Sequence, residues 1–62
     1  MNIETNELLI DIMTIIKGME ADYLRARKST YDFEEKQIYA EGEAALQNLR
    51  YRIGKLVKER NA

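Results

Sequence analysis

The chain has 62 residues, a net charge of −1, and no cysteine, histidine or proline. Disulfide bonds are therefore excluded, and zinc or thiolate sites are not expected, because they use cysteine and histidine ligands. Apolar residues make up 45% of the chain and charged residues 34%, a balance that favours helices over disorder. The small net charge provides no general attraction for nucleic acid or anionic lipid.

The first predicted helix covers residues from about 5 to 28. Thr5 or Asn6 can serve as its N-cap, and the basic residues near its end suit the negative pole of the helix dipole. Its apolar residues cover an arc of about 180°, much wider than the stripe of an ordinary surface helix. The arc contains Leu8, Leu9, Ile12, Met13, Ile15, Ile16, Met19, Tyr23, Leu24 and Ala26, with its seam at Leu9, Ile12, Ile16, Met19, Tyr23 and Ala26. One neighbouring helix cannot cover this arc.

The second predicted helix covers residues from about 33 to 59, after a turn over about 29–32. Asp32 and Glu35 have the spacing of a capping box, with Ser29 or Thr30 as alternative caps. The spacing of the inner stripe is closer to an 11-residue repeat than to a heptad. That stripe contains Ile38, Gly42, Ala45, Leu46, Leu49, Ile53, Leu56 and Val57. Gly42 favours close helix packing, whereas Gly54 costs about 1 kcal/mol relative to alanine without an evident reason.

A short turn between two long helices predicts an antiparallel hairpin, so we expect residues 1–62 to form one all-α domain. Opposite charges at adjoining helix ends favour the same orientation, although helix dipoles alone produce this distribution. The expected neighbours are Glu4, Glu7 and Asp11 with Arg50, Arg52, Lys55 and Lys58, and Arg25, Arg27 and Lys28 with Asp32, Glu34 and Glu35.

Dimerisation of two hairpins into a four-helix bundle is expected because so short a chain rarely builds a sufficient core alone. The residues predicted to pack in the core or at the dimer interface are Leu8, Leu9, Ile12, Met13, Ile15, Ile16, Met19, Tyr23, Ile38, Gly42, Ala45, Leu49, Ile53 and Leu56.

No residue set predicts an enzyme, a cofactor, a metal site or a small-molecule substrate. Ser29 is the only serine, and no histidine is present to activate it. Glu20 falls inside the apolar arc, where it can bind a cation, act as a base, or pair with an arginine of a neighbouring helix. The absence of Glu-x-x-His pairs favours the ion pair.

Two regions are candidates for binding a macromolecule. The hairpin tip concentrates arginine and aromatic side chains, which are enriched in protein interfaces, although a local capping contact is an alternative explanation for Phe33. The tip residues are Arg25, Arg27, Lys28, Tyr31 and Phe33. The basic end of the second helix can contact nucleic acid, or be a solvated helix end that complements the dipole. Its residues are Arg50, Tyr51, Arg52, Lys55 and Lys58.

An outward stripe on the second helix is expected to form the second seam of the dimer or a site for another partner. It consists of Phe33, Ala40, Ala44 and Tyr51.

The sequence thus predicts a small regulatory or inhibitory protein that acts through protein–protein binding as a homodimer. A nucleic-acid-binding bundle and a structural assembly subunit are the alternatives. The acidic N-terminal stretch, the lack of a long apolar run and the lack of cysteine favour a cytoplasmic protein with no membrane contact.

Overall fold

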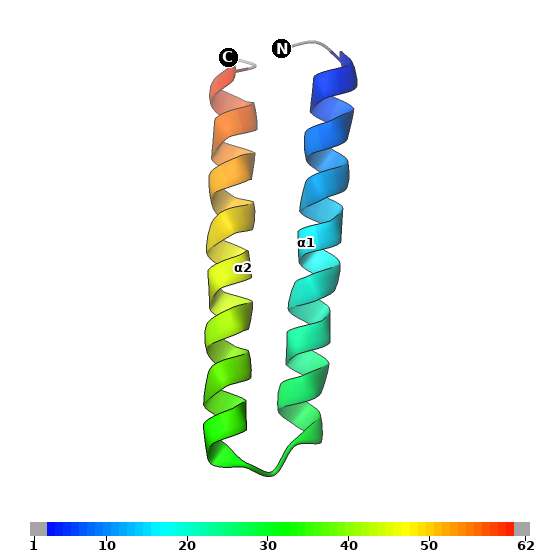
Figure 1. Ribbon diagram of the computed structural model, residues 1–62. Coiled ribbons are helices and arrows are strands. Elements are labelled where there is room, and N and C mark those ends of the chain that lie inside the picture. The colour runs from blue at the N-terminus through cyan, green and yellow to red at the C-terminus, as the bar shows by residue number, and fades with distance from the viewer. Residues whose placement is uncertain (1–2, 61–62) are drawn as a thin grey trace.

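The computed structural model describes residues 3–60, which form two α-helices joined by a short turn (Figure 1). Helix α1 covers Ile3–Ser29 and helix α2 covers Phe33–Arg60. The helices run in opposite directions, so the start of α1 and the end of α2 lie at the same end of the molecule (Figure 1). The protein is therefore an all-α helical hairpin, as predicted. Because α1 already includes Thr5 and Asn6, the prediction that one of them is its N-cap is wrong.

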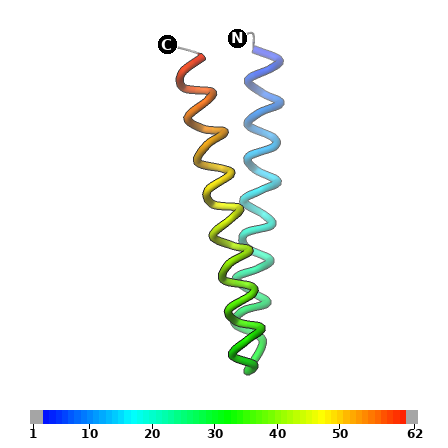
Figure 2. The backbone as a smooth tube through the Cα atoms, turned by 60° about the vertical axis from the view of Figure 1, so that its left-hand side comes forward, coloured from blue at the N-terminus to red at the C-terminus, as the bar shows by residue number. Residues whose placement is uncertain are grey.

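The hairpin is long and only one helix thick. Its extents are 46 × 16 × 9 Å, and its radius of gyration is 14.4 Å. A compact domain of this length has a radius of about 11 Å. Figure 2 shows the two helices following each other along the whole length at a shallow inclination, with no further layer against either side. Within residues 3–60, Ile16 is the one apolar side chain that is buried, with 6% of its surface exposed.

The turn is closed by hydrogen bonds that Asp32 organises. Its Oδ1 accepts a hydrogen bond from the Glu35 backbone N–H at 3.0 Å, which makes Asp32 the N-cap of α2. The Glu35 carboxylate does not return directly to the Asp32 backbone, as it does in a standard capping box. It accepts the Thr30 hydroxyl at 2.6 Å, and Thr30 Oγ1 accepts the Asp32 N–H at 3.2 Å. The Thr30 hydroxyl group thus lies between the Glu35 carboxylate and the Asp32 N–H, which bond directly to each other in a standard capping box.

The seam between the helices has strict heptad spacing. Two heptad series of buried or half-buried residues form it: Leu9, Met13, Ile16, Glu20, Tyr23 and Arg27 on α1, and Tyr39, Glu43, Leu46, Arg50, Ile53 and Val57 on α2. Half-buried residues outside these series include Leu24 of α1 and Gly42 and Gly54 of α2. Alternating steps of three and four residues keep one edge of each helix against the other. The 11-residue spacing predicted for α2 therefore does not describe the contact edge of the hairpin.

The expected inner stripes include side chains that the hairpin leaves exposed. On α1 these are Ile12 and Met19, and on α2 they are Ile38, Ala45, Leu49 and Leu56. Each helix carries two adjacent apolar stripes about 100° apart, and a single partner helix can cover only one of them. Hydrophobicity alone favoured the stripe richest in aliphatic residues. The hairpin instead buries the stripe that contains Glu20 and Arg27, which form ion pairs with residues of α2.

Candidate interaction surfaces

An ion pair between the helices lies in the middle of the seam. The carboxylate of Glu20 accepts hydrogen bonds from Arg50 Nε at 2.6 Å and from Arg50 Nη2 at 3.1 Å. The Glu20 side chain is 8% exposed and that of Arg50 is 36% exposed. The hydrogen bond to Glu20, and then the negative charge of Glu20, raise the pKa of Arg50 above its usual value, against a smaller opposing effect of burial. This pair matches the prediction that Glu20 meets an arginine of a neighbouring helix.

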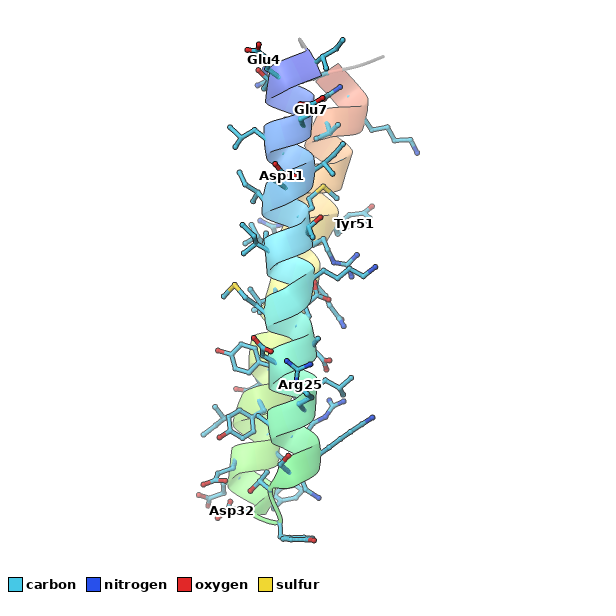
Figure 3. All side chains as sticks on the ribbon, turned by 90° about the vertical axis from the view of Figure 1, so that its right-hand side faces the viewer. Glu4, Glu7, Asp11, Arg25, Asp32 and Tyr51 are labelled. Atoms are coloured by element: carbon cyan, nitrogen blue, oxygen red, sulfur yellow. The ribbon has the colours of Figure 1, made fainter. Side chains whose placement is uncertain are left out.

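A second ion pair joins Arg27 Nη1 to Glu43 Oε1 at 3.2 Å. Among residues 3–60, these two are the ion pairs that cross between the helices. They differ from the expected pairs, which joined charges at the adjoining helix ends. Asp11 and Arg25 lie on the side of α1 that faces away from α2 (Figure 3), so neither can reach across the seam. The orientation inferred from charge was right, but the individual pairs were wrong.

One broad side of the hairpin carries most of the exposed aliphatic residues. In an antiparallel helix pair, the residues that precede the seam positions by one lie on the same side of both helices. We call this side the apolar face. It contains Leu8, Ile12, Ile15, Met19 and Ala26 from α1 and Ile38, Gly42, Ala45, Leu49 and Leu56 from α2. Two further positions, Asp22 and Arg52, place one charge of each sign on it.

Tyr23 shapes the apolar face near the hairpin tip. Its ring lies 6.3 Å from that of Tyr39, with an interplanar angle of 47°. A Cβ atom at Gly42 would lie 2.9 Å from the Tyr23 ring, which explains the glycine by contact within the hairpin itself. A shallow hollow of about 290 Å³ extends here over both helices, lined by Met19, Asp22, Tyr23, Ala26 and Tyr39. The face is therefore uneven, because it is hollowed near the tip, where the small residues Ala26 and Gly42 lie among larger ones such as Ile38.

The opposite broad side gathers basic residues. One hollow on that side is lined by four of the five residues predicted as the basic end of the second helix: Arg50, Tyr51, Lys55 and Lys58. Arg52, the fifth member of that run, belongs to the apolar face, where its Nε donates to Asn48 Oδ1 at 3.2 Å. Tyr51 extends beyond the edge of the hairpin (Figure 3).

Two residues of α1 on this basic side, Met13 and Lys17, were missed as members of a site. No local pattern marks these two residues, because only the antiparallel register of the two helices brings them beside Arg50 of α2.

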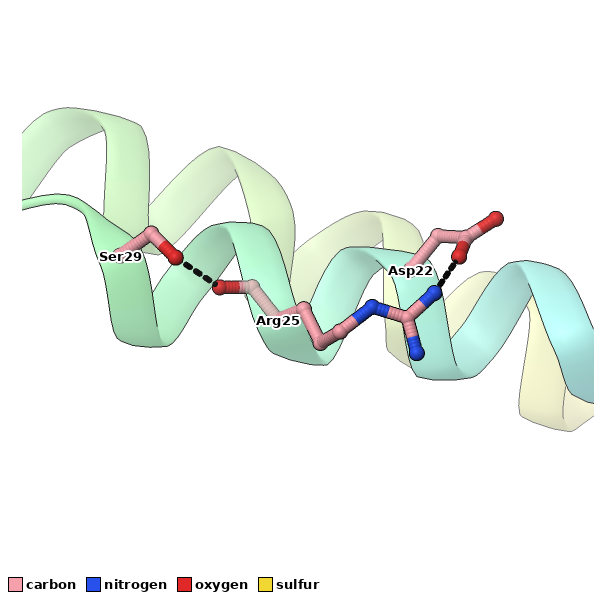
Figure 4. Close-up of polar contacts among 3 residues, drawn as sticks. All are labelled: Asp22, Arg25 and Ser29. Atoms are coloured by element: carbon pink, nitrogen blue, oxygen red, sulfur yellow. Dashed lines mark hydrogen bonds and ion pairs between the residues drawn. The ribbon is translucent and has the colours of Figure 1, made fainter.

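The hairpin tip separates into engaged and exposed residues. Arg25 pairs with Asp22 of its own helix, and the Ser29 hydroxyl donates to the Arg25 carbonyl at 2.8 Å (Figure 4). Arg27 is held by the ion pair with α2 described above. By contrast, Tyr31 is 100% exposed and Phe33 is 78% exposed. Of the five predicted tip residues, Arg27 is half-buried and the other four are exposed, Arg25 within its surface pair with Asp22.

Within residues 3–60, acidic side chains nowhere gather into a group of three that could hold a metal ion. No helix in that range is long and apolar enough to cross a membrane. Comparisons with protein families, curated proteins and solved structures find no match for this chain. What it does must therefore be inferred from its surfaces.

Proposed function

We propose that this chain is a non-enzymatic binding protein, a small regulator or inhibitor that acts as a homodimeric four-helix bundle in the cytoplasm. The observation that supports this proposal is the apolar face. Seven large apolar side chains of this face are exposed, and their exposed fractions add up to about three and a half fully exposed residues. They are Leu8, Ile12, Ile15, Met19, Ile38, Leu49 and Leu56. Monomeric soluble proteins seldom leave such a continuous apolar surface in water.

A second copy is the occupant that best fits this face. The face carries one acid and one base, Asp22 and Arg52, so two copies bring no net charge into their interface. Both helices contribute apolar residues along the length of the hairpin, which suits the face-to-face packing of two hairpins. The resulting bundle would cover the broad arc of α1 on both of its edges, which a single hairpin cannot do.

The apolar area is large enough to favour association of two copies. Burial of the exposed fractions is worth roughly 5–10 kcal/mol per protomer, or about 10–20 kcal/mol per dimer. Loss of translational and rotational freedom costs about 4–15 kcal/mol. At the midpoints of these two ranges association is favoured by about 5 kcal/mol, which corresponds to a Kd on the order of 0.1 mM.

Two matched substitutions test the dimer. Ile15 and Ile10 are 63% and 56% exposed and belong to the same helix, but Ile15 lies on the apolar face and Ile10 on the opposite side. We expect the protein at about 1 mM, well above a Kd on the order of 0.1 mM, to sediment at close to twice its 7.3 kDa mass. Ile15→Glu should sediment as a monomer under these conditions, and Ile10→Glu should remain a dimer. A monomeric parent protein, or equal effects of the two substitutions, would overturn the proposal.

The regulatory action is assigned to the exposed aromatic residues of the tip. Tyr31 and Phe33 lie at the end of the hairpin, away from the proposed dimer interface, and aromatic side chains of this kind anchor protein interfaces. A photo-crosslinking amino acid at position 31, introduced in the source cells, should give a discrete adduct with another protein. Phe33→Ala should abolish that adduct while the dimer persists. Adducts of the chain with itself in an open series, larger than a dimer, would instead support a structural assembly subunit.

A further inference from the structure

A groove lies on the side of the hairpin opposite the apolar face, and it is independent of the proposed dimer. Two hollows of about 450 and 230 Å³ adjoin there, and they share Met13 and Arg50 as lining residues. Together we call them the basic groove. Its remaining lining residues are Ile10, Thr14 and Lys17 of α1 and Tyr51, Gly54, Lys55 and Lys58 of α2. Both helices thus contribute to one continuous site.

The charged side chains that line the groove are all cationic. Lys17 comes from α1, and Lys55 and Lys58 come from α2. Arg50 is the fourth cation, and its charge is balanced by Glu20. The groove therefore carries a net positive charge on a chain whose total charge is −1. This local excess attracts an acidic ligand and disfavours a basic one.

Arg50 keeps hydrogen-bonding capacity for a ligand while it pairs with Glu20. Glu20 occupies the edge of the guanidinium formed by Nε and Nη2. A guanidinium group has five N–H donors, so the edge formed by Nη1 and the second Nη2 hydrogen remains for another carboxylate. The ion pair fixes the orientation of the side chain, and this lowers the entropy cost of binding at the free edge.

The bottom of the groove is apolar and contains Gly54. A glycine inside a helix costs about 1 kcal/mol relative to alanine. A Cβ at this position would lie 3.4 Å from Met13 Cε, the end of a flexible side chain, which is an ordinary contact. The hairpin itself therefore does not require the glycine, in contrast to Gly42. Its effect is to deepen the hollow beside Met13, so that an apolar group of a ligand can enter.

We propose that the basic groove binds an acidic amphipathic helix of a partner protein. An aliphatic side chain of that helix occupies the hollow over Gly54 and Met13, and its flanking carboxylates contact the surrounding lysines and the free edge of Arg50. A nucleic-acid strand fits less well, because its phosphates would use the lysines but leave the apolar hollow empty. Tyr51, which is 71% exposed, is the one feature that would suit a stacked base.

The test compares two fluorescent probes on the full chain by anisotropy. The first is a pool of 18-residue helical peptides with Leu, Ile or Phe along one ridge and Glu beside it. The second is a 15-nucleotide oligothymidylate. Binding of the acidic pool is expected, and a pool with Lys in place of Glu should not bind. Tighter binding of oligothymidylate, with a steep loss of affinity between low and moderate salt, would overturn the proposal in favour of nucleic acid.

Three variants locate the site. Gly54→Leu fills the hollow and should raise the Kd of the acidic pool at least tenfold. Lys17→Glu with Lys58→Glu should do the same while helicity is retained, because both side chains are exposed. Lys28→Glu with Lys36→Glu is the matched control, with one exposed lysine from each helix outside the groove. No binding of the acidic pool, or equal loss in the control, would refute the proposal. Sedimentation of the same variants should show an intact dimer, which separates this result from the dimer test.

Discussion

Replacement of each glycine by alanine is the same chemical change in three different surroundings. Each substitution gains about 1 kcal/mol of helix propensity, because alanine loses less backbone entropy than glycine on folding. The added Cβ meets nothing within 4 Å at Gly18 and a flexible methionine tip at 3.4 Å at Gly54. At Gly42 it meets the Tyr23 ring at 2.9 Å. The steric contribution therefore differs while the propensity gain stays constant.

The expected sign of the stability change follows from these distances. Gly18→Ala should stabilise the protein by about 1 kcal/mol, and Gly54→Ala by a similar or slightly smaller amount. At Gly42 the Tyr23 ring must move, and overpacking of this kind costs about 1–3 kcal/mol. The gain in propensity offsets part of that cost, so Gly42→Ala should be neutral or destabilising by up to about 2 kcal/mol.

Urea unfolding followed by circular dichroism at 222 nm measures these differences, at one protein concentration for all variants because association contributes to stability. The double variant Gly42→Ala with Tyr23→Leu isolates the contact with the ring. In the Tyr23→Leu background, Gly42→Ala should recover most of the propensity gain. If Gly42→Ala stabilised the parent protein as much as Gly18→Ala does, the proposed packing of Tyr23 against α2 would be wrong.

Three other changes probe the seam and the turn. Ile16→Ala removes the buried apolar side chain and should cost about 2–5 kcal/mol, seen as a lower urea midpoint; an unchanged midpoint would contradict its burial. Glu20→Gln should lower the melting temperature because Arg50 loses its carboxylate, whereas Asp22→Asn, which breaks an exposed pair, should change stability by less than about 0.5 kcal/mol. Asp32→Ala should cost about 1 kcal/mol by loss of the N-cap, and Asp32→Asn should retain most of it; equal losses would show that the capping bond is unimportant.

The amino-acid sequence was sufficient to predict two helices, their antiparallel orientation and the role of Asp32 in the turn. These features depend on interactions between residues close in the chain. Helix propensity without proline, dipole complementarity and a capping side chain act within a few residues, so each leaves a local signal. The Glu20 ion pair was also predictable in kind, because a carboxylate inside an apolar arc needs a partner.

The tertiary structure alone decided which edge of each helix faces the other. The two apolar stripes of α1 are adjacent, and the stripe richer in aliphatic residues is the one that the hairpin leaves exposed, so local pattern does not determine how the helix is rotated about its axis. That rotation depends on contacts between residues far apart in the chain, such as Glu20 with Arg50 and Tyr23 with Gly42. The same rotation separates an apolar face from a basic groove on opposite sides of the hairpin. Neither surface can be assembled from one helix, because each requires the register that joins α1 to α2.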